Sequence, residues 1–170
     1  MKDIFERSLI MHEQLRGKIG VVGKMPITSH DDLSLAYTPG VARSCGVIAS
    51  GSCKARELTI KRNSVAVVSD GSAVLGLGNI GAHAAIPVME GKSLLFKVFA
   101  DIDAWPICLD TQDVDEILAT VRRIAPVFRG INLEDISPPR VFPSNRRCRT
   151  SASPSFTTIS TAPRSLFWPR

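Results

Sequence analysis

Three short runs of apolar and β-branched residues, each followed by an acidic turn, constrain the fold of this chain most. "SVAVVSDG" (64–71), "WPICLD" (105–110) and "GINLEDI" (130–136) have the length and composition of buried strands. Segments with helical character separate them, over residues 82–100 and 113–126. A strand–helix–strand–helix–strand order predicts an α/β layered domain with a mostly parallel sheet.

The two intervening segments carry recognisable helix signals. Residues 113–126 are amphipathic, and either Thr111 or Asp113 can cap the amino end of a helix there. In the more apolar segment before the second strand, Pro87 and Gly91 are poor residues for a helix interior, so we expect an interruption near them. A further apolar face at the start of the chain, over residues 3–15, predicts another helix.

Acidic residues follow each of the predicted strands. Asp70, Asp110, Glu134 and Asp135 all fall at or just past a strand's carboxyl end. Acids are common in turns, so any one of them has an ordinary structural explanation. In open α/β sheets, however, ligands bind at this edge. The four carboxylates together therefore predict a site there.

The glycine-rich segment "GLGNIG" matches the G-x-G-x-x-G template for binding a pyrophosphate at a helix amino end. Its glycines are Gly76, Gly78 and Gly81, and Asp101 and Asp103 lie where the template places an acidic residue. An extra turn separates the preceding strand from the glycines. We interpret the segment as a tight turn rather than a dinucleotide cradle.

Two further residues have side chains suited to proton transfer. Tyr37, in "LAYTPGV", is the only tyrosine of the chain and stands where a general acid can act. Lys92 follows a glycine in an otherwise apolar stretch, where low polarity favours a lysine that acts as a base. Each also has a structural alternative: Tyr37 as a plug between loop and domain, and Lys92 as a helix residue with its ammonium in solvent.

Glu134 and Asp135 form a candidate metal pair. Carboxylate oxygens are the ligands that Mg²⁺ or Mn²⁺ prefers, usually two or three of them completed by water and substrate. Neighbouring strand residues point to opposite faces, so both ligate one ion only if the strand ends and the chain turns. The Ser137-Pro138-Pro139 sequence predicts such an end.

The charge distribution argues against a nucleic-acid partner for the body of the chain. The net charge of the 170 residues is +5, but residues 1–140 hold 16 basic and 16 acidic residues. The five excess charges are arginines of residues 141–170. No apolar run is long enough for a membrane span, no secretory leader pattern begins the chain, and no cysteine pair has C-x-x-C spacing. We therefore expect a cytoplasmic protein with no membrane partner.

Several ordered blocks together resemble the N-terminal domain of bacterial malic enzymes. They are "LSLAYTPGVA", "VAVVSDGSAVLGLGNIG", "AAIPVMEGKSLLFK", "IDAWPICLDT" and "GINLEDISPPR", within residues 2–140. The resemblance implies oxidative decarboxylation of malate to pyruvate and CO₂ with NAD or NADP and Mg²⁺ or Mn²⁺. It places Tyr37 at the general acid, Lys92 at the general base and Glu134 and Asp135 at two metal ligands. It also implies a homodimer.

The resemblance further predicts where the domain ends. Residues 1–140 would form the substrate and metal domain, with the third metal ligand and the cofactor domain missing from this chain. The terminal "PSFTTISTAPRSLFWPR" can be back-translated so that a displaced frame reads "FHDDQHGTAIVVLA", the family's continuation. We therefore interpret residues 141–170 as a disordered, out-of-frame tail, and expect the fragment to be inactive alone. The alternatives are a non-catalytic dimerisation module and a nucleic-acid binder that uses the basic tail.

Overall fold

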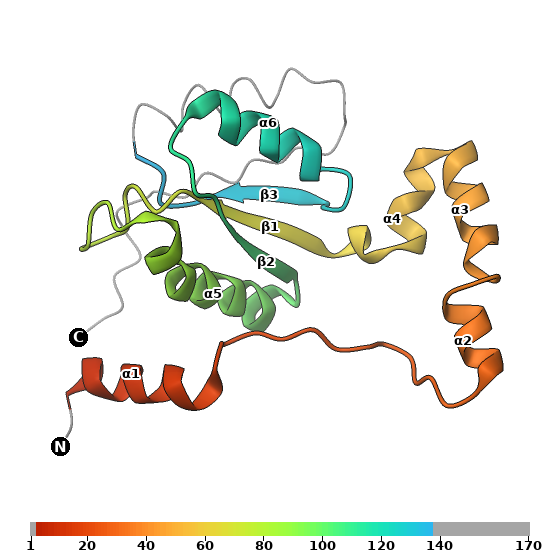
Figure 1. The fold of residues 1–170 in the computed structure, drawn as a ribbon, viewed down its shortest axis with the longest axis horizontal. Coiled ribbons are helices and arrows are strands. Elements are labelled where there is room, and N and C mark those ends of the chain that lie inside the picture. Colours follow the sequence, from red (N-terminus) through yellow and green to blue (C-terminus); the bar gives the residue numbers. More distant parts are fainter. Residues whose placement is uncertain (1–2, 138–170) are drawn as a thin grey trace.

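A three-stranded parallel sheet forms the centre of the protein. The computed structural model describes residues 3–137 (Figure 1). Strand β1 (Ser64–Ser69) lies between β2 (Asp103–Cys108) and β3 (Gly130–Leu133), and both neighbours pair with it in parallel. This confirms the predicted α/β fold with its parallel sheet, although β2 begins two residues earlier than the predicted run. The predicted tail, residues 141–170, lies outside the described residues.

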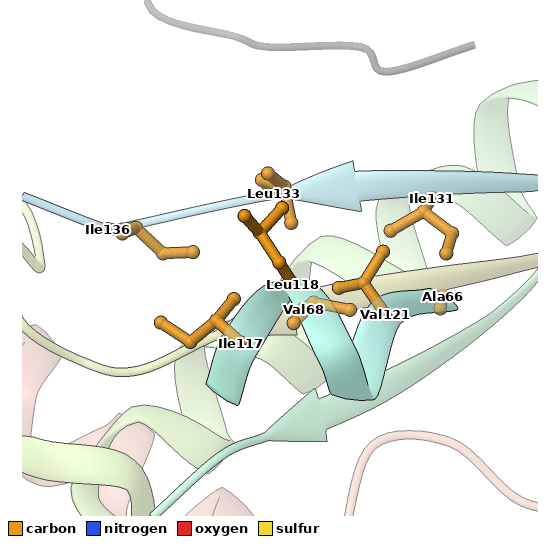
Figure 2. Close-up of a cluster of buried hydrophobic side chains, with 8 residues drawn as sticks. All are labelled: Ala66, Val68, Ile117, Leu118, Val121, Ile131, Leu133 and Ile136. Atoms are coloured by element: carbon orange, nitrogen blue, oxygen red, sulfur yellow. The ribbon is translucent and has the colours of Figure 1, made fainter. Parts of the chain in front are cut away.

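Helix α6 (Val114–Ile124) covers one face of the sheet and closes the larger hydrophobic core. The carboxylate of Asp113 accepts hydrogen bonds from the backbone N–H groups of Asp115 and Glu116, so Asp113 is the N-cap. Apolar side chains of the helix meet those of β1, β3 and the turn after β3 (Figure 2). The cluster consists of Ala66, Val68, Ile117, Leu118, Val121, Ile131, Leu133 and Ile136.

Helix α5 (Gly81–Ala100) covers the opposite face, where Met89 packs against Val67 and Ala104. The expected interruption is wrong, because the helix runs unbroken through Pro87 and Gly91. A proline ring removes only one backbone donor. Burial of the helix face that contains Met89 against the sheet outweighs that loss, so packing overrides propensity.

The residues before β1 form helices that stand apart from this core. Helix α1 lies beside α5, an extended segment follows it, and three further helices project away from one end of the sheet (Figure 1). None of these helices contains a buried residue. We call residues 30–58 the arm. The elements are α1 (Ile4–Leu15), α2 (His30–Ala36), α3 (Val41–Ser50), α4 (Ala55–Leu58) and the short 3-10 helices Ser52–Lys54 and Ile60–Arg62.

Candidate active site

Parallel pairing brings the acidic residues to one edge of the sheet, as the sequence predicted. Asp70, Asp110, Glu134 and Asp135 all follow the carboxyl end of β1, β2 or β3. Their surroundings differ. Asp70 is buried and accepts a hydrogen bond from the Ser72 backbone N–H at 2.9 Å, which closes the turn after β1. Asp110 is exposed on a loop. The carboxylates best placed for metal binding or catalysis are therefore Glu134 and Asp135, which follow the end of β3.

Lys92 of α5 and Glu134 form an ion pair across this edge. The Nζ atom of Lys92 lies 3.3 Å from each of the two carboxylate oxygens of Glu134. The Lys92 side chain is 28% exposed and that of Glu134 is 15% exposed, so the pair is largely shielded from water. Asn132, buried on β3, donates from Nδ2 to Oε2 of Glu134 at 2.9 Å. The Glu134 carboxylate is thus held by two side chains from separate elements.

Asp135 lies in the turn that the metal hypothesis requires. β3 ends at Leu133, and Asp135 adopts a left-handed backbone conformation with φ of +53°, which aspartate tolerates better than most residues. Its carbonyl accepts a hydrogen bond from Ala73, which fixes the turn against the loop after β1. Burial, and then the negative charge of Glu134, raises the pKa of Asp135, while Lys92 opposes the rise.

A cavity of about 480 Å³ opens beside Lys92 and Glu134, between α1 and α5. Two residues that the sequence analysis missed line it from the N-terminal side. His12 contacts the Ser8 carbonyl through Nδ1 at 2.7 Å, while its buried Nε2 has no hydrogen-bond partner within the described chain. Lys18 donates from Nζ to the Pro87 carbonyl at 2.7 Å. For Lys18 the sequence offered no signal, and for His12 it offered only a position on the predicted helix. The contact between α1 and α5 joins segments that are far apart in the sequence.

The structure does not bring Tyr37 to this centre. Tyr37 ends α2, where its backbone N–H bonds to the Leu33 carbonyl, and it is 70% exposed. Helix α2 lies at the opposite end of the view from the carboxyl end of β3 (Figure 1). The predicted general acid, Tyr37, and the predicted general base, Lys92, therefore lie in separate regions of the chain.

The glycines of "GLGNIG" form the turn between β1 and α5. Gly76, Gly78 and Gly81 all have φ between +75° and +80°, a region that favours glycine. The turn is closed on itself, because the backbone N–H of Gly81 donates to the Gly71 carbonyl and Val74 pairs with Gly78. This geometry suits a tight connection at the edge of the site.

The donor set fits a hard divalent cation in part. Two adjacent carboxylates in partly buried surroundings, one of them destabilised by the charge of the other, are the oxygen donors that Mg²⁺ or Mn²⁺ takes. Over residues 3–137, no three His, Cys, Asp or Glu side chains gather closely enough to hold a metal ion. Glu134 and Asp135 would therefore need further oxygen donors from water or substrate.

None of the helices in the same residues has the length and apolarity to cross a membrane.

A parallel sheet covered by helices on both faces, with a lysine–carboxylate ion pair at its carboxyl edge, defines an α/β domain with a candidate site at the edge where such sheets bind ligands. The family profile of the malic enzyme N-terminal domain matches residues 16–149. The chain therefore belongs to the malic enzyme family, as the resemblance predicted.

Individual relatives agree with this assignment. A NAD-dependent malic enzyme of Geobacillus stearothermophilus is 58% identical over 147 residues, which cover 86% of this chain and 30% of that protein. An NADP-dependent malic enzyme of Escherichia coli is 48% identical over 85% of this chain and 19% of its own length. The crystal structure of a malic enzyme from Pyrococcus horikoshii superposes with a TM-score of 0.85 at 49% identity, covering 88% of this chain and 35% of that one. The chain thus spans about a third or less of these relatives.

Proposed function

We propose that this chain is the malate- and metal-binding part of a malic enzyme, which converts (S)-malate to pyruvate and CO₂ with NAD or NADP. The observation that carries the proposal is the contact between Lys92 and Glu134 beside Asp135 at the carboxyl edge of the sheet. Relatives named as NAD-dependent and as NADP-dependent match at similar coverage, so either nicotinamide is consistent with the chain.

The proposed proton transfers assign one step to each of two side chains. Lys92 would accept the proton of the malate hydroxyl, and a bound nicotinamide would supply the acceptor for the hydride of C2. Cleavage of the C3–C4 bond then releases CO₂ and leaves its electron pair in the enolate of pyruvate. The Tyr37 hydroxyl donates a proton to C3 of that enolate. The partly shielded setting of Lys92 suits the first step, because exclusion of water strengthens its interaction with the substrate.

Glu134 and Asp135 are the residues that would hold Mg²⁺ or Mn²⁺. The bound cation would supply Lewis-acid stabilisation to the oxygens of malate and to the negative charge of the enolate. Asn132 contributes by orienting Glu134, since its amide fixes one carboxylate oxygen at 2.9 Å. The Ala73 hydrogen bond does the same for the backbone of Asp135.

The same resemblance supports a division of the chain. We propose that residues 1–140 form the substrate and metal domain and that residues 141–170 are an out-of-frame tail. Because the chain spans about a third of the G. stearothermophilus relative, we expect the nicotinamide-binding residues to lie outside these 170 residues. The purified 170-residue chain should therefore not reduce NAD⁺ or NADP⁺ with malate and Mn²⁺. Sequencing the genomic locus around codon 141 tests the displaced reading frame directly.

Metal binding by the isolated chain tests the site itself. Titration with Mn²⁺, followed by the electron paramagnetic resonance signal of the free ion, should show one bound ion per chain in the presence of malate. Glu134→Gln should weaken this binding at least about tenfold, because a carboxylate ligand of a divalent cation is lost. Asp110→Asn removes an exposed carboxylate at the same edge and is the matched control. Equal binding by the wild-type and Glu134→Gln chains would reject the metal assignment.

A second candidate role, as an interaction module, is favoured by one observation. The helices before β1 have no buried residue, and large apolar side chains are exposed along them. Association with another chain would cover this surface. The two roles are compatible, since an enzyme domain can also assemble through such helices.

A further inference from the structure

Asn132 has a buried acceptor atom that no group of the described chain uses. Its side chain lies on β3 at 1% exposure, and Nδ2 donates to Oε2 of Glu134 at 2.9 Å. A carboxylate only accepts hydrogen bonds, so the amide nitrogen faces Glu134 and the amide oxygen points elsewhere. This Oδ1 atom is buried and has no hydrogen-bond partner among residues 3–137. A buried amide oxygen without a donor is costly, so a donor within reach should bind it.

The register of the sheet places Asn132 on the face that α5 covers. Asn132 is aligned with Val67 of β1, and Val67 packs against Met89 of α5. The residues on either side of Asn132 in β3 belong instead to the cluster beneath α6. Helix α5 is therefore the element that can supply a donor. Ser93, the buried polar side chain of α5, already donates its hydroxyl proton to the Met89 carbonyl at 2.9 Å.

Lys92 is the donor of α5 that lies nearest to this amide. Helix α5 follows the carboxyl end of β1 and leads to the amino end of β2, so it runs antiparallel to both strands. Side chains tilt toward the amino end of their helix, which directs the Lys92 stem back toward the carboxyl edge of the sheet. Its Nζ atom and Nδ2 of Asn132 contact the same oxygen, Oε2 of Glu134. One oxygen atom thus lies between the ammonium and the amide.

The contact between Lys92 and Glu134 leaves room for a second acceptor. Nζ lies 3.3 Å from each carboxylate oxygen. This is longer than a strong charge-assisted hydrogen bond, at about 2.7–2.9 Å. A divalent cation held by Glu134 would compete with the ammonium for the same oxygens. The flexible four-carbon stem of lysine then allows the amine to move to a neutral acceptor beside it.

We propose that Oδ1 of Asn132 is a second acceptor for the Lys92 amine, which moves onto it when a divalent cation withdraws the Glu134 carboxylate. The proposal rests on the proposed function, which makes Glu134 a metal ligand and Lys92 the base. Asn132 is then a positioning residue for Lys92, beyond its contact with Glu134. An amide oxygen accepts an N–H from an ammonium and from a neutral amine alike, so this hydrogen bond does not depend on the protonation state of Lys92.

Nuclear magnetic resonance of the full 170-residue chain, labelled at its asparagine side chains, tests the proposal without metal. Glu134→Ala withdraws the carboxylate permanently, so the Lys92 amine should move to Oδ1. The side-chain carbonyl carbon of Asn132 should then resonate downfield of its position in Glu134→Ala/Lys92→Met, which has no amine. In chains that keep Glu134, Lys92→Met should move this signal much less, which completes a double-mutant cycle. Equal signals in the two Glu134→Ala chains would assign Oδ1 to a buried water and overturn the proposal.

Hydrogen exchange of the Lys92 ammonium provides a second measurement. In the Glu134→Ala chain, Asn132→Leu removes the proposed acceptor with little change in volume. The ammonium protons should then exchange with water at least about tenfold faster, because a hydrogen bond to a charged group is lost. Lys97, which two aspartates hold near the amino end of β2, is the matched control and should keep its rate. An unchanged rate at Lys92 would overturn the proposal. If Asn132→Leu does not fold, the carbonyl measurement, which keeps Asn132, still decides.

Mg²⁺ with malate tests the step that depends on metal. In the wild-type chain the two together should move the Asn132 carbonyl signal downfield, and Lys92→Met should abolish this movement. The Mn²⁺ titration shows separately whether the ion binds. Binding without movement of the signal would overturn the transfer from Glu134 to Asn132. If no ion binds, the metal assignment of the proposed function fails, while the Glu134→Ala chains still decide whether Lys92 uses Asn132.

Discussion

The sheet with α5 and α6 differs from the arm in what holds each region in place. Every buried hydrophobic residue in the described part of the chain lies between residues 66 and 136. The arm has none, yet its helix α2 begins with a complete capping box, in which Ser29 and Asp32 each bond to the other's backbone N–H. Local signals are therefore sufficient to define a helix here, while burial against a partner decides where that helix sits.

The largest effect should come from a cavity in the core. Ile117 of α6 is 1% exposed within the core cluster, so Ile117→Ala should lower the free energy of unfolding by about 4 kcal/mol. Leu35→Ala removes an apolar side chain of similar size from the arm, where it is 65% exposed. At a chain concentration too low for association, it should change that free energy by less than about 0.5 kcal/mol. Urea unfolding followed by circular dichroism measures both. Similar losses would mean that the arm packs with the core.

Substitution of a glycine in the turn between β1 and α5 should lower the free energy of unfolding almost as much. A Cβ atom added at Gly71 would lie 2.3 Å from the Gly81 carbonyl oxygen, and the φ of +67° adds strain for any other residue. Gly71→Ala should therefore lower the free energy of unfolding by about 3 kcal/mol. Gly76 has a similar φ of +80° but nothing within 4 Å of the added atom, so Gly76→Ala should cost only about 1 kcal/mol. Equal costs in urea unfolding would show that strain alone, and not the close approach of α5, requires glycine here.

The sequence defined the core well because its signals are local. The three strands and α6 follow from apolar runs that the chain displays over a few positions, and the capping residues narrowed the amino end of α6 to Thr111 or Asp113, of which the structure selects Asp113. The same runs placed Glu134 and Asp135 at the carboxyl edge. The interruption expected at Pro87 did not occur, because the prediction weighed the intrinsic cost of proline and had no measure of the burial of the Met89 face.

The distance between the candidate acid and base could not be predicted in the same way. Tyr37 and Lys92 were grouped by the chemistry that the family resemblance implies, which carries no information about the distance between them. The approach of His12 to Lys92 was equally inaccessible, because it depends on how α1 packs against α5, far along the sequence. Residues whose position depends on long-range packing are those that the sequence did not place.

Substitutions at helix caps should have smaller effects on stability, and they test the same difference between the core and the arm. Asp113→Ala removes two hydrogen bonds from the amino end of α6 and should lower the free energy of unfolding by about 1 kcal/mol. Ser29→Ala removes the equivalent side-chain bond from α2 in the arm. It should leave global unfolding unchanged and instead speed amide hydrogen exchange within residues 30–36. A matching drop in global stability would contradict the separation of the two regions.

The smallest expected effects are on the pH dependence of stability. They should have opposite signs at the carboxyl edge of the sheet and in the arm. Burial, followed by the charge of Glu134, raises the pKa of Asp135 above its usual 3.8. Hydrogen bonds, first from Thr28 and then from Ser29, lower the pKa of Asp32 in the arm. The folded chain holds the Asp135 proton more tightly than the unfolded chain does, so this group's contribution to stability falls as pH rises from 3.8 through the folded pKa. The contribution of Asp32 is present above 3.8 and is lost as pH falls through its lowered pKa.

Carboxyl-carbon nuclear magnetic resonance separates these two titrations in one experiment. The midpoint of Asp135 should lie above 3.8 and that of Asp32 below it. Asp135→Asn should remove the decline in stability between 3.8 and the raised pKa, whereas the exposed Asp110→Asn should keep it. If Glu134 and Asp135 hold a cation, added Mg²⁺ favours the charged carboxylate and should lower the Asp135 midpoint without moving that of Asp32. A shift of both midpoints by Mg²⁺ would instead indicate general screening, and would remove the distinction between a metal-binding edge of the sheet and an arm that binds no metal.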